Sequence, residues 1–235
     1  MIAALTPPGV AVAEHTAGTL TGSLLPEERA ALGNATEGRV REFATGRSCA
    51  RQALAVLGVT PAPILRGADR QPLWPAGVVG SITHCRGYCG AAVARRADFA
   101  SLGVDAEPNE PLPYGVIDHV ALPQEQAWIR QRSDGVHWDR LLFCAKEAVF
   151  KAWYPLTEHW LRFADVLVHW EPERGAFRAD VLDVDRSPRA GQPAPPACFA
   201  GRLAVSDGLL FALVLVSADG VSAPPPPPAP AASPC

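Results

Sequence analysis

The segment Gly103-Val104-Asp105-Ala106-Glu107 places two carboxylates two positions apart at the end of a short apolar run. Such a run predicts a buried strand, which Pro108 ends. Side chains two apart on a strand share a face and stand about 6.6 Å apart along it. Asp105 and Glu107 can therefore address one Mg²⁺ ion, which takes carboxylate oxygens together with waters and substrate phosphates. The alternative is that the two acids only solvate a strand end.

A second charged group consists of Lys146 and Glu147, followed by Lys151, in a segment with helical periodicity. Glu147 and Lys151 are four positions apart and share one helix face, with Lys146 beside them. Apolar residues cover much of the same helix: Leu141, Leu142, Phe143, Val149, Phe150 and Trp153. Charges on a largely buried helix need partners, and a metal with phosphate supplies one for each sign. A surface ion pair is the simpler alternative.

Two further groups of residues are suited to phosphate. Thr83 and His84 end another predicted strand, where a hydroxyl and an imidazole can hydrogen-bond phosphate oxygens, although a histidine there can also be purely structural. Arginines gather upstream within thirteen positions, at Arg39, Arg41, Arg47 and Arg51. They form either a phosphate grip or the solvated face of a helix.

Helices and strands must position these groups. One helix is predicted to begin at Pro26, and a second to run from an N-cap at Thr36 to a stop at Gly58. Two more are predicted over 125–132 and over 138–153, and Tyr154 and Pro155 end the last of them. Strands are predicted over 78–83, 90–94, 100–104, 166–170, 177–182, 198–205 and 209–216. Each half is a helix followed by strands, which suggests pseudo-symmetry without a repeat in the sequence to prove it.

The composition limits the class of protein. A net charge of -3 gives no general attraction to nucleic acid or to an anionic membrane, and no apolar run is long enough to span a bilayer. Six cysteines are too sparse for a disulfide scaffold, and no secretory signal precedes them, so we expect a cytoplasmic protein.

Taken together, these motifs resemble the Sfp-type 4'-phosphopantetheinyl transferases, in particular their EntD-like branch. The resemblance rests on the motifs at 81–84, 103–107 and 146–151, which follow one another in this order along the chain, and it extends upstream to 39–43, 46–51 and 64–67. It implies an α+β fold, a pseudo-dimer of two similar α/β subdomains, each with a long helix packed on an antiparallel sheet. We expect the subdomains at 1–108 and 109–218, and a disordered proline-rich tail at 219–235.

The resemblance also implies a role for each candidate residue. Asp105, Glu107 and Glu147 are expected to bind Mg²⁺, with Ala106 standing where some relatives carry an acid. The residues expected to bind coenzyme A are Arg39, Arg47, Arg66, Thr83, His84, Lys146 and Lys151. Arg66 stands where several relatives have lysine, which keeps the charge but changes the hydrogen-bond geometry. Glu147 and Lys151 are the expected catalytic residues.

The reaction implied is transfer of phosphopantetheine from coenzyme A to a serine of an apo acyl or peptidyl carrier protein, giving holo-carrier protein and 3',5'-ADP. The resemblance implies a carrier of polyketide, nonribosomal peptide or fatty acid biosynthesis, with siderophore biosynthesis among the pathways expected, and we expect a monomer. Exposed apolar residues such as Leu122, Trp128 and Ile129 are candidates for carrier docking, or else belong to the core.

Two other functions stay open at this point. Asp105 and Glu147 could form the acid and base pair of a hydrolase of the glycosidase kind, although this leaves the lysines unexplained. The chain could also be a non-catalytic module that grips coenzyme A or a carrier protein through Arg39, Arg47 and His84.

Overall fold

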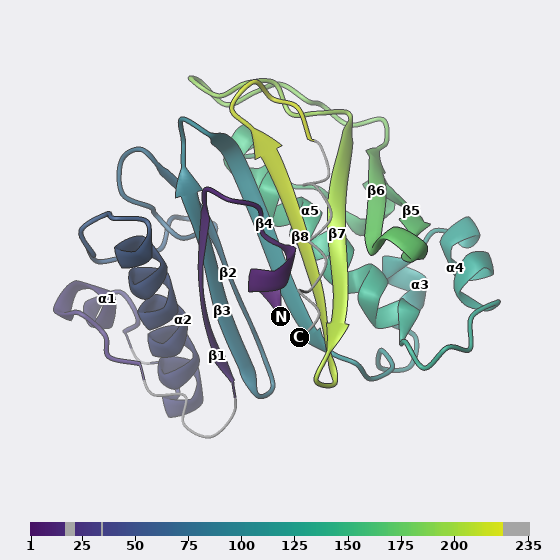
Figure 1. Ribbon diagram of the computed structural model, residues 1–235, viewed down its shortest axis with the longest axis horizontal. Coiled ribbons are helices and arrows are strands. Elements are labelled where there is room, and N and C mark those ends of the chain that lie inside the picture. Colours follow the sequence, from purple (N-terminus) through teal and green to yellow (C-terminus); the bar gives the residue numbers. More distant parts are fainter. Residues whose placement is uncertain (17–21, 34, 223–235) are drawn as a thin grey trace, which may run out of the picture.

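The computed structural model describes residues 1–16, 22–33 and 35–222, and Figure 1 shows an α+β fold with two antiparallel sheets. The helices are α1 (Pro26–Ala30), α2 (Glu37–Val56), α3 (Ile117–Val120), α4 (Pro123–Ile129) and α5 (Trp138–Thr157), with short 3-10 turns at Ile2–Leu5, Phe163–Asp165 and Pro172–Arg174. The strands are β1 (Val10–Thr16), β2 (Val78–Cys85), β3 (Tyr88–Arg95), β4 (Phe99–Pro108), β5 (Val166–Glu171), β6 (Ala176–Val181), β7 (Cys198–Ser206) and β8 (Leu209–Ser217). No helix among these residues is long and apolar enough to cross a membrane.

The first sheet has the order β1-β3-β2 and carries α2 on one face. The Thr36 side chain accepts a hydrogen bond from the Arg39 backbone N–H, so the predicted N-cap begins this helix. Gly46 lets α2 approach the sheet, because a Cβ there would stand 3.1 Å from the Ile82 side chain. The strand β1 was not predicted, and it completes this sheet at one edge by pairing with β3.

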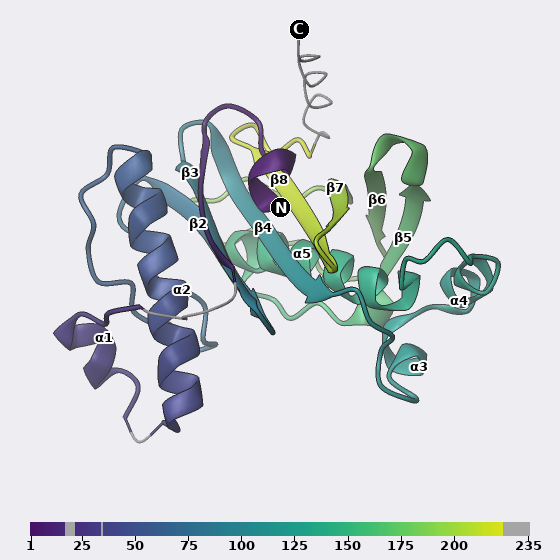
Figure 2. The ribbon, with the colours of Figure 1, turned by 60° about the horizontal axis from the view of Figure 1, so that its bottom comes forward.

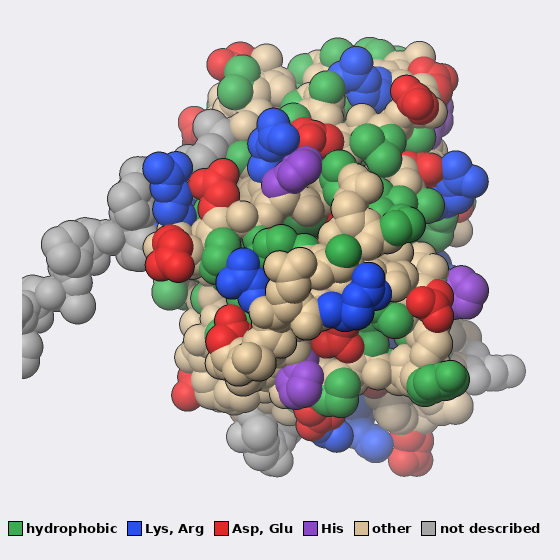
Figure 3. Space-filling view, turned by 90° about the vertical axis from the view of Figure 1, so that its right-hand side faces the viewer, with side chains coloured by type: hydrophobic (Ala, Val, Ile, Leu, Met, Phe, Trp, Pro, Cys, Tyr) green, Lys and Arg blue, Asp and Glu red, His purple; other side chains and the backbone are tan. Residues whose placement is uncertain are grey.

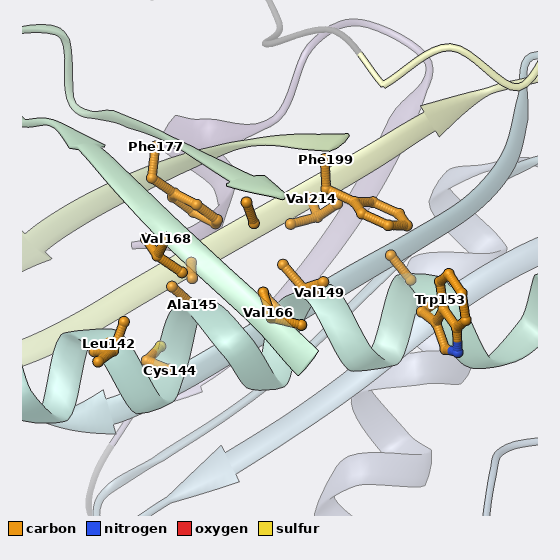
Figure 4. Close-up of a cluster of buried hydrophobic side chains, with 14 of the residues drawn as sticks. Leu142, Cys144, Ala145, Val149, Trp153, Val166, Val168, Phe177, Phe199 and Val214 are labelled. Carbon is orange, nitrogen blue, oxygen red and sulfur yellow. The ribbon is translucent and has the colours of Figure 1, made fainter. Parts of the chain in front are cut away.

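The second sheet has the order β4-β8-β7-β6-β5 and is covered by α5. Figure 4 shows side chains of α5, among them Ala145, Val149 and Trp153, pointing toward Phe199 and Val214 of the sheet. In Figures 1 and 2, α2 lies at one end of the molecule and α3 and α4 at the other. The expected α+β fold, with a long helix on an antiparallel sheet in each half, is therefore confirmed.

Small residues bring α5 unusually close to β4. A Cβ at Gly103 would overlap the backbone oxygen of Ala148 and stand 2.7 Å from the backbone nitrogen of Ala152. The Ser101 hydroxyl donates a 2.7 Å hydrogen bond to the Ala152 carbonyl. This approach lets charged side chains of the strand and of the helix meet at one place.

The two sheets meet where β2 lies beside β4. These strands share no backbone ladder; instead, Ser81 Oγ accepts the Val104 N–H at 3.1 Å, and Thr83 Oγ1 accepts the Ala106 N–H at 3.1 Å. Both hydroxyl residues are buried. The side-chain bonds therefore satisfy two backbone donors that would otherwise be buried without a partner.

Two predicted boundaries can be compared with these elements. The α5 helix continues through Pro155 to Thr157, where Glu158 adopts a left-handed conformation and its N–H bonds to the Tyr154 carbonyl, so the predicted end at 153 is one turn too early. The strand β4 pairs with β8 of the second sheet, although it precedes the predicted subdomain boundary at 108. That boundary stays a prediction, and the proposed tail lies outside the described residues from 223 onward.

Candidate active site

A cavity of about 360 Å³ opens where the two halves meet and is lined from both of them. The strand β4 contributes Asp105 and Glu107, and α5 contributes Glu147 and Lys151. From the other half come Arg39, Arg47, Arg66, Thr83 and His84. The structure thus brings together every predicted site residue except Lys146.

Asp105 is the best anchored of the acidic residues. Its Oδ1 atom accepts hydrogen bonds from Lys151 Nζ at 2.6 Å and from Thr83 Oγ1 at 2.9 Å. Its other oxygen, Oδ2, is buried without a hydrogen-bond partner among the described residues. A buried carboxylate oxygen without a partner is costly unless a ligand satisfies it, so this atom is suited to coordinate a cation.

Two further carboxylates stand close to Asp105 at the cavity. Burial raises the pKa of Glu147, Lys151 opposes the rise, and Asp105 and Glu107 add to it. Burial and the charge of Asp105 also raise the pKa of Glu107, against a 2.9 Å ion pair with Arg140. Such mutual repulsion among carboxylates is relieved by a bound cation.

The carboxylates are not already wrapped around a metal position. Within the described part of the chain, no group of three or more His, Cys, Asp or Glu side chains is arranged to hold a metal ion. The ion pair with Arg140 directs the Glu107 side chain away from a shared metal position, which partly explains why the three carboxylates do not converge. One or two carboxylates with substrate phosphates are nevertheless enough for Mg²⁺.

The opposite wall of the cavity is strongly basic. Arg47 is buried and donates a 2.7 Å hydrogen bond from Nε to the Ile64 carbonyl. Burial lowers its pKa to about 10, Glu28 opposes the shift, and Arg66, Arg39 and Arg51 lower the pKa further. Several guanidinium groups near one point favour a bound anion with more than one negative charge.

The remaining residues of the basic wall differ in how they are held. Arg39 Nη1 lies 3.1 Å from His84 Nε2 and forms a 3.2 Å ion pair with Glu42. The side chains of Arg66 and Arg70 have no hydrogen-bond or ion-pair partner among the residues that the structure describes. Arg70 was not predicted as a site residue, and its backbone has φ 68, a conformation that non-glycine residues rarely adopt.

Glu28 is a second residue that the sequence did not single out. It is fully buried, and its carboxylate accepts hydrogen bonds from Arg51 at 2.6 Å and 2.7 Å and from the Ile64 N–H at 3.0 Å. Arg47 holds the carbonyl of the same Ile64. The segment that leads to Arg66 is therefore fixed at Ile64, to α1 through Glu28 and to α2 through Arg47. The sequence predicted the helix that begins at Pro26 and includes Glu28, but it did not predict the pairing of Glu28 with Arg51.

Lys146 lies away from the cavity, contrary to the expected role in binding coenzyme A. Its ammonium is buried and donates to the Val120 carbonyl at 2.9 Å, to Glu125 Oε2 at 2.7 Å and to the Phe163 carbonyl at 2.9 Å. All three of its donors are thus used inside the second half of the chain. Neighbouring residues on a helix point about 100° apart, so Lys146 cannot face the cavity with Glu147.

A larger cavity of about 530 Å³ adjoins this site and shares Arg70, Pro72, Ile82 and Lys151 with it. The rest of its wall includes Leu73, Trp74, Phe150, Tyr154 and Pro155. It is therefore more apolar than its neighbour.

The candidate docking residues on α4 belong largely to the core. The Trp128 ring packs 4.9 Å from Trp138 and 5.8 Å from Trp170, and Ile129 packs against the same cluster. Figure 3 shows the surface at this end of the molecule, where Lys and Arg side chains alternate with Asp and Glu. Among the described residues that this view shows, the two signs of charge are therefore mixed.

Comparison with known proteins identifies the family. Residues 27–94 match the model of the 4'-phosphopantetheinyl transferase N-terminal domain, and residues 101–190 match that of the 4'-phosphopantetheinyl transferase superfamily. Svp of Streptomyces mobaraensis is 49% identical over 93% of this chain and 90% of its own length. PptT of Mycobacterium tuberculosis is 46% identical over 82% of this chain and 86% of its own length. Npt of Nocardia iowensis is 41% identical over 91% of this chain and 99% of its own length.

All three relatives are named 4'-phosphopantetheinyl transferases. Enterobactin synthase component D of Escherichia coli strain K12 matches less well, at 34% identity over 52% of this chain and 59% of its own length. The predicted family is confirmed, with the EntD-like branch more distant than these three relatives. Agreement over both halves also favours the enzyme over a non-catalytic binding module. The chain therefore belongs to the 4'-phosphopantetheinyl transferase family, enzymes that use coenzyme A to activate carrier proteins.

Proposed function

We propose that this chain transfers phosphopantetheine from coenzyme A to a serine of an apo acyl or peptidyl carrier protein at the cavity between its two halves. The observation that carries the proposal is the meeting of an acidic wall and a basic wall in one cavity. The basic residues suit the phosphates of the nucleotide, and the acidic residues suit a cation and the transfer of a proton. We place the reaction in the cytoplasm and the working form as a monomer.

The acidic wall fits Mg²⁺. The partnerless Oδ2 of Asp105 is an oxygen ligand in the chemistry this ion prefers, and Glu147 and Glu107 are oxygen donors in the same cavity. When bound, Mg²⁺ would neutralise charge on the pyrophosphate oxygens. Lys151 is tied to Asp105 at 2.6 Å and to the Val104 carbonyl at 3.1 Å, so its positive charge is fixed beside the same oxygens.

The basic wall would bind the nucleotide part of coenzyme A. Arg39, Arg47 and Arg66 approach one another closely enough to affect the pKa of Arg47, as a site for the dianionic 3'-phosphate requires. His84 and Arg39 lie side by side at this wall. Thr83 contributes in a different way, since its hydroxyl is already bonded to Asp105 and to the Ala106 N–H. Its proposed role is to orient Asp105.

Glu147 is the proposed general base. Burial raises its pKa above the ordinary value of 4.5, which strengthens its carboxylate as a proton acceptor. It takes the proton of the serine hydroxyl as the serine oxygen attacks the β-phosphorus. The bond from that phosphorus to the bridging oxygen breaks, and 3',5'-ADP leaves beside Lys151. The lysine stabilises the negative charge that develops on this oxygen.

The larger cavity is the proposed place of the pantetheine arm. It begins at Lys151, where the pyrophosphate would lie, and continues along apolar side chains that suit the dimethyl group and chain of the arm.

The substitution Glu147→Gln tests the proposal because it keeps the size of the side chain but removes the base. Intact-protein mass spectrometry of an apo-carrier protein with coenzyme A and Mg²⁺ should show a gain of one phosphopantetheine with the wild type. The variant should bind coenzyme A but transfer at least about a hundredfold more slowly, the usual worth of a general base.

Glu42→Gln is a matched control, because Glu42 lines the same cavity on its basic side, away from the proposed proton transfer. At saturating coenzyme A it should retain most of kcat, because its ion pair with Arg39 bears on coenzyme binding and not on the proton transfer. Equal rates for wild type and Glu147→Gln would remove Glu147 from the role of base.

A further inference from the structure

A hydrogen bond joins the two halves at the larger cavity, away from the charged walls. Tyr154 in the last turns of α5 donates its hydroxyl to Asp69 Oδ2 at 2.5 Å. The two residues are 85 positions apart in the sequence, and both line this cavity. The Tyr154–Asp69 bond is therefore part of the cavity wall.

Asp69 lies at the tip of a narrow turn. Arg66 and Pro72 pair at its base, and the Gly67 N–H bonds to the Gln71 carbonyl at 2.8 Å. Within the turn, the Arg70 N–H bonds back to the Gly67 carbonyl at 3.1 Å, and the Asp69 N–H bonds to the Gln71 side chain at 3.0 Å. The same turn thus carries Asp69 toward α5 and Arg66 and Arg70 toward the phosphate site.

The other end of the bond belongs to the catalytic helix. Tyr154 follows Lys151 by one turn and Glu147 by two, so it is rigidly connected to both. Tyr154 is buried, whereas Asp69 is exposed. Burial and the hydrogen bond to Asp69 raise the pKa of the phenol to about 12, so it stays a donor at neutral pH.

We propose that the Tyr154–Asp69 hydrogen bond is a positioning contact that closes the larger cavity around the pantetheine arm and strengthens coenzyme A binding. The inference rests on the proposed function, because it needs the arm to lie in this cavity. Neither residue lines the smaller cavity, where the reaction is proposed to take place. The bond fixes the turn to α5, and the arm would pass through the space that they enclose.

Isothermal titration of the full chain with coenzyme A and, separately, with 3',5'-ADP tests this, in the presence of Mg²⁺. The product 3',5'-ADP has the nucleotide but lacks the arm. Tyr154→Phe and Asp69→Ala should each weaken coenzyme A binding about 3- to 10-fold, the usual worth of one hydrogen bond, and should weaken 3',5'-ADP binding less, because the turn also carries Arg66 and Arg70. The double variant should lose no more than either single one, because both remove the same bond.

Kinetics provide a second readout. The KM for coenzyme A should rise by the same factor while kcat at saturating coenzyme A stays constant. Asp69→Asn keeps an acceptor and should restore most of the affinity. Tyr114→Phe is the matched control, because Tyr114 is fully exposed and lines neither cavity.

Unchanged coenzyme A affinity in both single variants, or an equal loss for coenzyme A and 3',5'-ADP, would overturn the inference. Failure of the wild type to bind coenzyme A or to modify any apo-carrier protein would instead overturn the proposed function. Tyr154 and Asp69 are changed in separate variants. If one variant fails to fold, the other still tests the inference.

Discussion

The hydroxyl of Thr83 makes two contacts that serve different purposes. It donates to Asp105 Oδ1 at 2.9 Å and accepts the Ala106 N–H at 3.1 Å, so it both orients a carboxylate and joins β2 to β4. Thr83 bonds only to Oδ1 of Asp105, and Oδ2 of the same carboxylate has no hydrogen-bond partner among the described residues. A single side chain thus links the architecture to the proposed cation site.

Thr83→Val should lower both stability and activity. Valine has nearly the same shape but leaves the buried Ala106 N–H without an acceptor, at a cost of about 1–3 kcal/mol in the free energy of unfolding. Denaturant unfolding measures the first effect and the carrier transfer rate the second. Thr83→Ser keeps the hydroxyl and should recover most of both. A valine variant as stable as the wild type would contradict this account.

At this scale, the sequence predicted most of the candidate site. The motifs at Asp105, Glu107, Glu147 and Lys151 pointed to one cavity, where the structure brings these residues together. Lys146 could not be separated from Glu147 by sequence alone, because its partner Glu125 lies 21 positions away. Arg70 and Asp69 were also missed, since a turn with a strained arginine leaves no periodic pattern.

Among the elements, the contact of α5 with β4 decides where the charged groups lie. Gly103 faces Ala148 and Ala152 across this contact. The glycine of the strand motif is therefore needed for packing, and the carboxylates that follow it are needed for chemistry.

Gly103→Ala should destabilise the fold, because backbone atoms of α5 must move away to make room. Overpacking of this kind costs at least about 1–3 kcal/mol in the free energy of unfolding. Gly38→Ala is the control, since a Cβ there meets nothing within 4 Å and alanine favours a helix by about 0.5–1 kcal/mol. Thermal melts of both variants should shift in opposite directions; a Gly103→Ala variant as stable as the wild type would argue against the close contact.

The buried ion pair of Lys146 and Glu125 fixes several elements to α5. Glu125 also accepts the Val168 N–H and the Leu122 N–H, each at 2.7 Å, so the pair connects α4, α5 and β5. Lys146→Met should cost about 3–5 kcal/mol, because it leaves the Glu125 carboxylate buried without its cation.

Adding Glu125→Gln to Lys146→Met should recover part of that loss, because the glutamine carries no charge. Chemical denaturation of the two single variants and the double variant measures this coupling. If Lys146 instead bound coenzyme A directly, its substitution would weaken coenzyme binding with little effect on unfolding.

The elements themselves were predicted with one main omission. The strands from β2 to β8 and the helices α1, α2, α4 and α5 all overlap their predicted ranges. The short apolar run Val10-Ala11-Val12-Ala13, which Glu14 ends, is consistent with a strand but equally with part of a buried helix, so the sequence did not single out β1. The order of the strands could not be predicted, because their pairing depends on contacts between distant segments.

For the molecule as a whole, the repelling carboxylates make stability depend on pH and ligand. The folded state raises the pKa of Glu147 and Glu107, so it retains protons that the unfolded chain has released. Protonation of Glu147 and Glu107 therefore contributes fully to the stability of the fold below the ordinary pKa of 4.5. This contribution is lost as pH rises through the raised pKa values of the folded state.

The melting temperature of the metal-free chain should fall as pH rises from 4.5. The fall should be smaller for Glu147→Gln, since glutamine does not titrate. Mg²⁺ with coenzyme A should restore stability at neutral pH, by about 2.7 kcal/mol at a ligand concentration a hundredfold above Kd. Identical pH profiles for variant and wild type would show that Glu147 does not have the raised pKa.

The join between β2 and β4 has a consequence for turnover. In the described part of the chain, β2 and β4 lack the ladder of backbone bonds that fixes the register within each sheet, and the hydroxyls of Ser81 and Thr83 link them instead. Slight sliding at this join changes the gap between the arginines on one side and the carboxylates on the other. The buried cluster around Tyr88 and Phe211 packs across the same join, so such sliding has to repack apolar side chains that the two sheets share. We therefore expect only a small displacement when spent nucleotide leaves.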